Sequence, residues 1–147
     1  MKEQCLVCNR ISPKYVAMFV HKIFDEIADK DTIHKIIIDA CNAINYADNK
    51  KRVALCGRSK ASILSGLLYW LGFRYGCVVT QRHIASCFPA KIKHFWHDTE
   101  GETFTEVAVS ESAKFWAKEF PELIKEEIKK RDQLNKSRRH RGRFQKH

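Results

Sequence analysis

Basic residues in two parts of the chain have the types and spacing needed to contact phosphate. Thr80, Gln81 and Arg82 stand at the expected start of a short helix, where unpaired backbone N–H groups can also bind an anion. Residues 135–147 contain no acidic residue and six basic ones: Lys136, Arg138, Arg139, Arg141, Arg143 and Lys146. Such a cluster favours contact with nucleic-acid phosphates, and the alternative is a solubilising tail.

A third group lies on a helix expected to begin at Pro89 and contains Ala90, Lys91, Lys93 and His94. A lysine on such a helix can donate to O6 and N7 of guanine in the major groove. The alternative is an amphipathic helix whose lysines are only solvated.

Cys5 and Cys8 form a Cys-x-x-Cys pair, which could bind zinc. Tetrahedral zinc needs four ligands, so His21, Cys41, Cys56 or a second chain would have to complete the site. A remnant zinc knuckle without metal is the favoured interpretation, and no cofactor is expected. A redox pair is disfavoured because no βαβ pattern surrounds it.

No motif in the sequence predicts catalysis. The chain contains no phosphate-binding glycine loop, no nucleophile elbow and no His-Glu-x-x-His. His94 and His97 can share a helix face, but no carboxylate or cysteine accompanies them at a matching spacing. We therefore expect neither enzymatic activity nor a small-molecule substrate.

Composition favours a small intracellular helical protein. The chain has 147 residues, of which 44% are hydrophobic, and a net charge of +10. Six of these charges lie in residues 135–147, which leaves +4 on the remainder. No run of eighteen apolar residues and no signal-peptide core appear, so we expect no membrane segment, no secretion and a cytoplasmic or nuclear location. The cysteines are then expected to be reduced.

Hydrophobic periodicity predicts an all-α fold, with a five-helix domain in residues 13–100. The helices are expected at residues 13–28, 31–47, 59–71, 81–88 and from 90. The third is apolar nearly all round and should lie at the centre. Its small residues Ala61, Ser65 and Gly66 would let another helix approach closely. The fourth and fifth form a helix-turn-helix.

Two appendages and one N-terminal segment complete the expected organisation. Residues 1–12 carry the Cys-x-x-Cys pair, residues 101–134 form a C-terminal helical extension, and residues 135–147 form a disordered basic tail. Thr103–Val109 is expected to be a loop or a short extended segment. The helix that follows from Ser110 either kinks at Pro121 or gives way to a new helix there.

Several of these motifs together resemble the cyclin-like repeat of transcription initiation factor B from archaea and eukaryotes. The resemblance extends over residues 57–96, and the two helices expected before Gly57 fit the same repeat. It rests on the following matches, in order: Gly57-Arg58-Ser59, Leu68-Tyr69-Trp70, Thr80-Gln81-Arg82-His83-Ile84 and Lys91-Ile92-Lys93-His94-Phe95-Trp96. Only one repeat is present, whereas the general factor carries two.

The resemblance implies a DNA-binding transcription protein or regulator of this type. It places the base-reading positions of the helix-turn-helix on Ala90 and Lys93, and a lysine lacks the planar fork of the family's arginine. It also implies a TATA-binding protein and RNA polymerase as possible partners. The alternative is a cyclin-fold module for protein–protein interaction, whose tail binds RNA or directs localisation.

Overall fold

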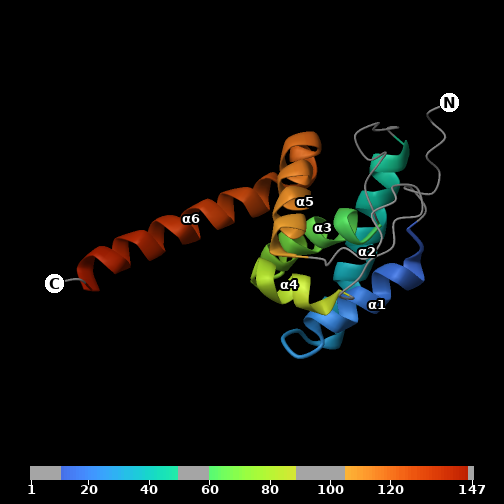
Figure 1. Cartoon of the computed structure of the whole chain (residues 1–147), viewed down its shortest axis with the longest axis horizontal. Coiled ribbons are helices and arrows are strands. Elements are labelled where there is room, and N and C mark those ends of the chain that lie inside the picture. Colours follow the sequence, from blue (N-terminus) through green and yellow to red (C-terminus); the bar gives the residue numbers. More distant parts are fainter. Residues whose placement is uncertain (1–10, 50–59, 89–104, 146–147) are drawn as a thin grey trace.

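The structure is a computed structural model that describes residues 11–49, 60–88 and 105–145 (Figure 1). Within these ranges the chain forms six helices and no strand, which confirms the all-α prediction. They are α1 (Pro13–Phe24), α2 (Lys30–Asn49), α3 (Lys60–Arg74), α4 (Gln81–Cys87), α5 (Glu106–Glu119) and α6 (Pro121–Gln145). No helix in the described ranges is both long and apolar enough to cross a bilayer.

Local capping chemistry sets the starts of α1 and α2. Ser12 accepts a hydrogen bond from the Tyr15 N–H at 3.1 Å, and Pro13 occupies the first helical turn. In α2 the cap is Asp29, whose Oδ1 accepts from the Thr32 N–H at 2.8 Å. The helix therefore begins at Lys30, slightly before the start expected at Asp31.

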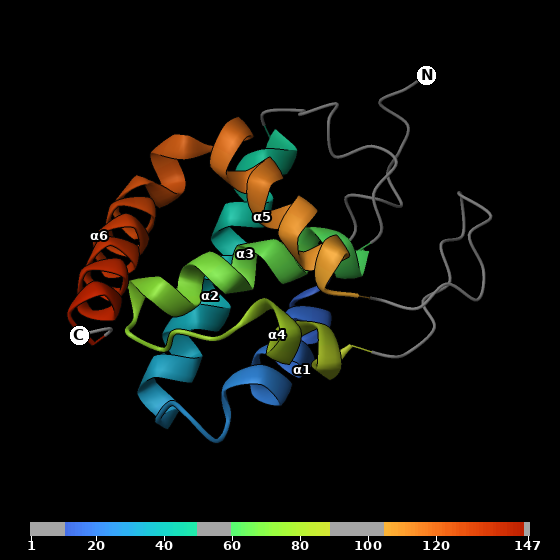
Figure 2. The ribbon, with the colours of Figure 1, turned by 60° about the vertical axis from the view of Figure 1, so that its left-hand side comes forward.

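Helix α3 lies at the centre of the bundle, as its apolar composition predicted. Eleven of its fifteen residues are buried, and it packs against α2, α4, α5 and α6 (Figure 2). A helix that packs against four neighbours needs few polar residues, because little of its surface meets water; Ser62 and Tyr69 are half-buried. The helix ends at Arg74, and Gly76 follows with a φ of +76°, a conformation that glycine adopts without strain.

The closest helix contact joins α3 to α5. The Gly66 N–H donates to Ser112 Oγ at 3.0 Å, and that hydroxyl donates to the Ile63 carbonyl at 3.2 Å. Trp116 Nε1 donates to the same carbonyl at 2.8 Å. A Cβ on Gly66 would collide with the backbone of Ser112 and Ala113. The expectation that small residues of α3 admit another helix is thus confirmed.

Helix α5 begins at Glu106, so the loop expected over Thr103–Val109 is wrong for its described residues from 106 onward. Val109 is fully buried and lies one turn before Ala113, so the apolar face of the helix starts earlier than Ser110. Pro121 opens a new helix, and Phe120 separates it from α5.

The segment expected as an extension over residues 101–134 contributes to the same core as the preceding helices. Its fully buried side chains in that core include Val109, Trp116, Phe120 and Ile124. Helix α6 then extends away from the bundle (Figure 1). Its backbone stays helical to Gln145, where disorder was expected from residue 135. Lysine, arginine and glutamine favour helix, and propagation from an anchored first turn needs no new nucleus.

Candidate nucleic-acid interface

Only part of the proposed DNA-binding surface falls on described residues. Thr80, Gln81 and Arg82 lie at the start of α4, and the arginines of the C-terminal cluster lie on α6. The expected recognition helix lies outside the described residues, with Ala90, Lys91, Lys93 and His94. The possible zinc ligands Cys5 and Cys8 also lie outside them.

The start of α4 is fixed by a cap and a buried anchor. Thr80 Oγ1 accepts from the His83 N–H at 3.0 Å, which confirms the predicted cap, and Ile84 is fully buried. With seven residues, α4 has a small dipole, and its cap already takes one first-turn N–H group. The phosphate contact expected at Thr80, Gln81 and Arg82 stays a prediction, and it would depend mainly on the side chains of Gln81 and Arg82.

Arg82 is exposed over 84% of its side chain and pairs with Glu106 Oε2 at 3.1 Å. Such an exposed ion pair contributes about 0–1 kcal/mol. A phosphate can therefore replace the carboxylate at small cost.

Thr80, Gln81 and Arg82 line a hollow of about 300 Å³ at the base of α6, which we call the basal hollow. Helix α3 contributes Tyr69 and Phe73 to its lining. Helix α6 contributes Arg131, Leu134 and Asn135. The fold thus brings the start of α4 beside the first turns of the basic part of α6. These segments are about fifty residues apart in the sequence.

Arg131 was not singled out from the sequence, and its guanidinium is the least satisfied cation beside the hollow. It lies over the Trp70 ring, 5.3 Å from the centroid. Trp70 is itself fixed by a hydrogen bond from Nε1 to the Ala113 carbonyl at 3.0 Å. Among the described residues, buried Nε of Arg131 has no acceptor, and the nearest carboxylate oxygen, of Asp132, is 3.9 Å from Nη2. The sequence shows a basic run at 129–131 but not this placement.

A buried ion pair fixes the direction in which α6 leaves the bundle. Glu127 is 1% exposed and its Oε2 accepts from Arg74 Nε at 2.5 Å. The same guanidinium donates to Asp39 Oδ2 at 3.2 Å and to the Leu123 carbonyl at 3.2 Å. Three helices, α2, α3 and α6, are therefore joined through Arg74. The Tyr75 hydroxyl also donates to Asp39, and burial together with this carboxylate raises the pKa of Tyr75 to about 12.

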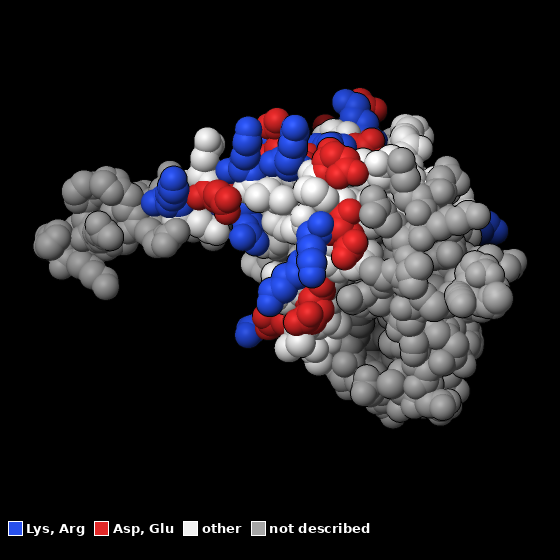
Figure 3. All heavy atoms as spheres, turned by 90° about the horizontal axis from the view of Figure 1, so that it is seen from above, with Lys and Arg blue, Asp and Glu red and all other residues white. Residues whose placement is uncertain are grey.

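Beyond this anchor, residues 129–145 of α6 form a basic arm. They include eight Lys or Arg residues and one acidic residue, Asp132. Seventeen residues of helix span about 25 Å. Arg138, Arg139, Arg141 and Arg143 lie on the part of α6 whose backbone remains helical to Gln145. Where Figure 3 colours the surface by charge, acidic side chains lie beside basic ones.

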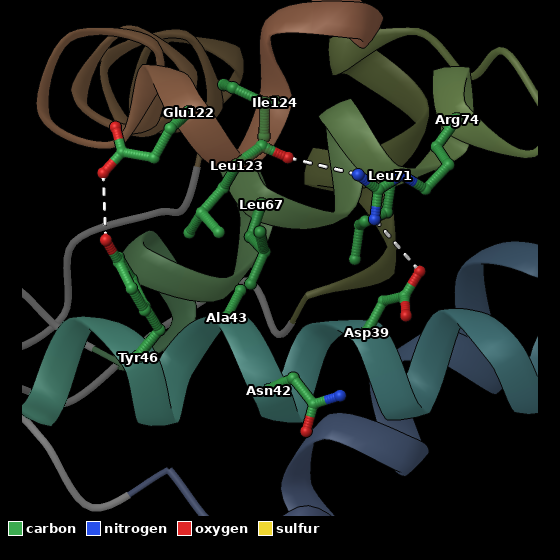
Figure 4. Close-up of a pocket in the computed structure, with 10 residues that line it drawn as sticks. All are labelled: Asp39, Asn42, Ala43, Tyr46, Leu67, Leu71, Arg74, Glu122, Leu123 and Ile124. Carbon is green, nitrogen blue, oxygen red and sulfur yellow. Dashed lines mark hydrogen bonds and ion pairs between the residues drawn. The ribbon is translucent and has the colours of Figure 1, made fainter.

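A second cavity, of about 320 Å³, lies between α2, α3 and α6 (Figure 4). Leu67, Leu71 and Ala43 give it apolar walls. At one end the Tyr46 hydroxyl donates to Glu122 Oε2 at 3.0 Å, and at the other Asp39 pairs with Arg74. Both of these pairs are internal contacts between helices, which explains their presence without a ligand.

The three described cysteines, Cys41, Cys77 and Cys87, form no disulfide. Burial raises the pKa of Cys41, Cys77 and Cys87, so none is a reactive thiolate. Cys87 Sγ lies 3.9 Å from His83 Nε2, and burial keeps the pKa of this thiol above its ordinary value. Within residues 11–49, 60–88 and 105–145, no three metal-ligating side chains come together.

No family model, no curated protein and no solved structure matches the chain. The resemblance to transcription initiation factor B therefore rests on the sequence motifs alone.

Proposed function

We propose that this protein binds DNA as a transcription protein of the initiation factor B type, with the basic arm as its main contact to the phosphate backbone. The observation that carries the proposal is the concentration of eight basic residues on an arm that the Arg74–Glu127 pair anchors to the core. An anchored arm presents its charges together, so phosphate contacts along it add up.

The arm and the start of α4 supply affinity but little sequence preference, because phosphates are alike in every sequence. Base recognition would come from Ala90, Lys91, Lys93 and His94 on the expected second helix of the helix-turn-helix. The resemblance adds a TATA-binding protein and RNA polymerase as partners.

Two variants with the same change in charge test the proposal. The first is Arg138→Gln/Arg139→Gln/Arg141→Gln on the arm. The control is Lys114→Gln/Lys118→Gln/Lys125→Gln, three exposed lysines on the bundle. Binding to a short duplex is measured by fluorescence anisotropy over a series of salt concentrations. The arm variant should bind at least about tenfold more weakly, and its salt slope should fall by up to about 3, at roughly 0.9 for each phosphate that the protein no longer neutralises.

Equal effects of the two variants, or wild-type binding that does not depend on salt, would contradict the proposal. Lys93→Glu in a chain lacking residues 136–147 then tests the helix-turn-helix. If this substitution has no effect and the deletion alone abolishes binding, the alternative gains: a protein-interaction module whose tail binds RNA or directs localisation.

A further inference from the structure

We infer that the basal hollow binds one unpaired nucleotide of a nucleic acid that the basic arm holds, with its base against Tyr69 and its phosphate on Arg131. The inference rests on the proposed function and adds to it a preference for a base outside the duplex. The sequence motifs predict a phosphate contact at Thr80, Gln81 and Arg82, but they assign no site for a base and do not include Tyr69 or Arg131.

The aromatic wall of the hollow is rigid. Tyr69 is half-buried and meets Trp70 and Phe73 edge-to-face, with ring centroids 5.3 and 5.5 Å apart. Trp70 is locked by its hydrogen bond to Ala113. A base that stacks on Tyr69 therefore meets a ring already fixed in place, which is how single-stranded nucleic acid is commonly bound without regard to sequence.

Part of the polar lining of the hollow is already engaged, because Arg82 pairs with Glu106 and Thr80 caps α4, and the rest is unused. In the part of the chain that the structure describes, the side chains of Tyr69, Gln81, Arg131 and Asn135 donate no hydrogen bond. Trp70 keeps the Arg131 guanidinium beside the hollow without consuming its donors. A guanidinium suits a phosphate, and two amides suit the donor and acceptor edges of a base.

Size and position favour a single nucleotide over a duplex. The volume of about 300 Å³ lies at the lower end of small-ligand sites. Leu134 and Asn135 line the hollow and also belong to the arm, so a strand that follows the arm arrives at its mouth. Inside a duplex both faces of a base are covered by its neighbours, and the base reaches a pocket only when unstacked.

The test compares a single-stranded oligothymidylate with an abasic strand of equal length, whose phosphates are the same. The wild-type protein should bind the base-bearing strand about tenfold more tightly. Tyr69→Leu and Arg131→Gln should bring this ratio close to one. Lys129→Gln, which removes an equal charge from an exposed position of the arm, should weaken both strands alike and preserve the ratio.

Gln81→Ala gives a second variant of the hollow that leaves the packing of Tyr69 intact, and it should lower the ratio as well. A wild-type ratio near one, or a ratio that Gln81→Ala and Arg131→Gln both leave unchanged, would overturn the inference. In that case the abasic strand and the duplex would still bind, and their affinities would still fall as the salt concentration rises. Failure of the proposed function looks different, because then no strand binds in a salt-dependent way.

Discussion

A carboxylate as deeply buried as Glu127 is stable only with a cation at short range, because desolvation of an unpaired charge costs several kcal/mol. Arg74 is that cation, and it is 38% exposed. Arg74→Met should destabilise the fold by about 3 kcal/mol, since it leaves the carboxylate buried without its partner. Glu127→Gln, which keeps the shape of the side chain, should cost less.

Urea unfolding monitored by circular dichroism measures both free energies. A smaller loss of stability for Arg74→Met than for Glu127→Gln would contradict the prediction that buried Glu127 depends on Arg74 as its cation. An exposed control such as Lys125→Met should stay within about 0.5 kcal/mol of the wild type.

Two tyrosines should make the fold sensitive to high pH. Burial raises the pKa of Tyr15 to about 12, and burial with Asp39 does the same for Tyr75, from an ordinary value of 10.0. A raised pKa in the folded state means that folding favours the neutral phenol. The contribution of these two neutral phenols to the stability of the fold is complete below pH 10 and is lost as the pH rises towards 12.

Absorbance of the phenolate in a pH titration checks this expectation. Two of the four tyrosines should ionise only near pH 12. Tyr15→Phe should remove one late-titrating group, and ionisation of all four near pH 10 would contradict the prediction.

Residue-level prediction from the sequence succeeded where the chemistry is local. Thr80 caps the helix that follows it, and Pro13 occupies the first turn of α1, because each acts on its own neighbours. Arg131 and Glu127 could not be found in this way. Their significance depends on Trp70 and Arg74, each more than fifty residues away, and no local pattern encodes such a contact.

At the scale of elements, periodicity located the described helices but misplaced their ends. Helix α1 stops at Phe24, although an apolar face was expected to residue 28. Helix α5 starts early because its first turn packs on the core. The early start of α5 depends on the burial of Val109 in the core, a long-range contact that the periodicity of a single segment does not contain.

The outer part of α6 should be separable from the fold. Among the α6 side chains that the structure describes, up to Lys136, the last fully buried one is Glu127, and Leu134 is half-buried. Deletion of residues 136–147 should therefore shift the melting temperature by only a few degrees while it weakens DNA binding. Differential scanning calorimetry measures the shift, and a large drop in stability would show that the arm contributes to the core.

The contact between α3 and α5 should tolerate no added atom. Gly66→Ala forces a methyl group into the backbone of Ser112 and Ala113, so the helices must separate. We expect the free energy of unfolding to fall by at least about 2 kcal/mol, within the usual range for overpacking. Lys114→Ala, on the exposed side of α5, is the control, and equal effects of the two variants would contradict the packing.

For the molecule as a whole, the main consequence is a single core. The helices before residue 88 and those after residue 105 contribute to one hydrophobic cluster, although the sequence indicated a domain with an extension. Thermal unfolding should therefore be one cooperative transition, with coincident curves from tryptophan fluorescence and from circular dichroism. Two separated transitions would contradict the prediction of a single cooperative core.

The hydrogen bond from Gly66 to Ser112 spans 46 residues, and this separation affects how the protein is made. Translation proceeds from the N-terminus at about 5–20 residues per second. When α1 to α4 have emerged from the ribosome, α5 has not yet been made, so the central helix α3 lacks its main packing partner. For several seconds that apolar surface is open to chaperones or to other nascent chains, and only the emergence of α5 closes it.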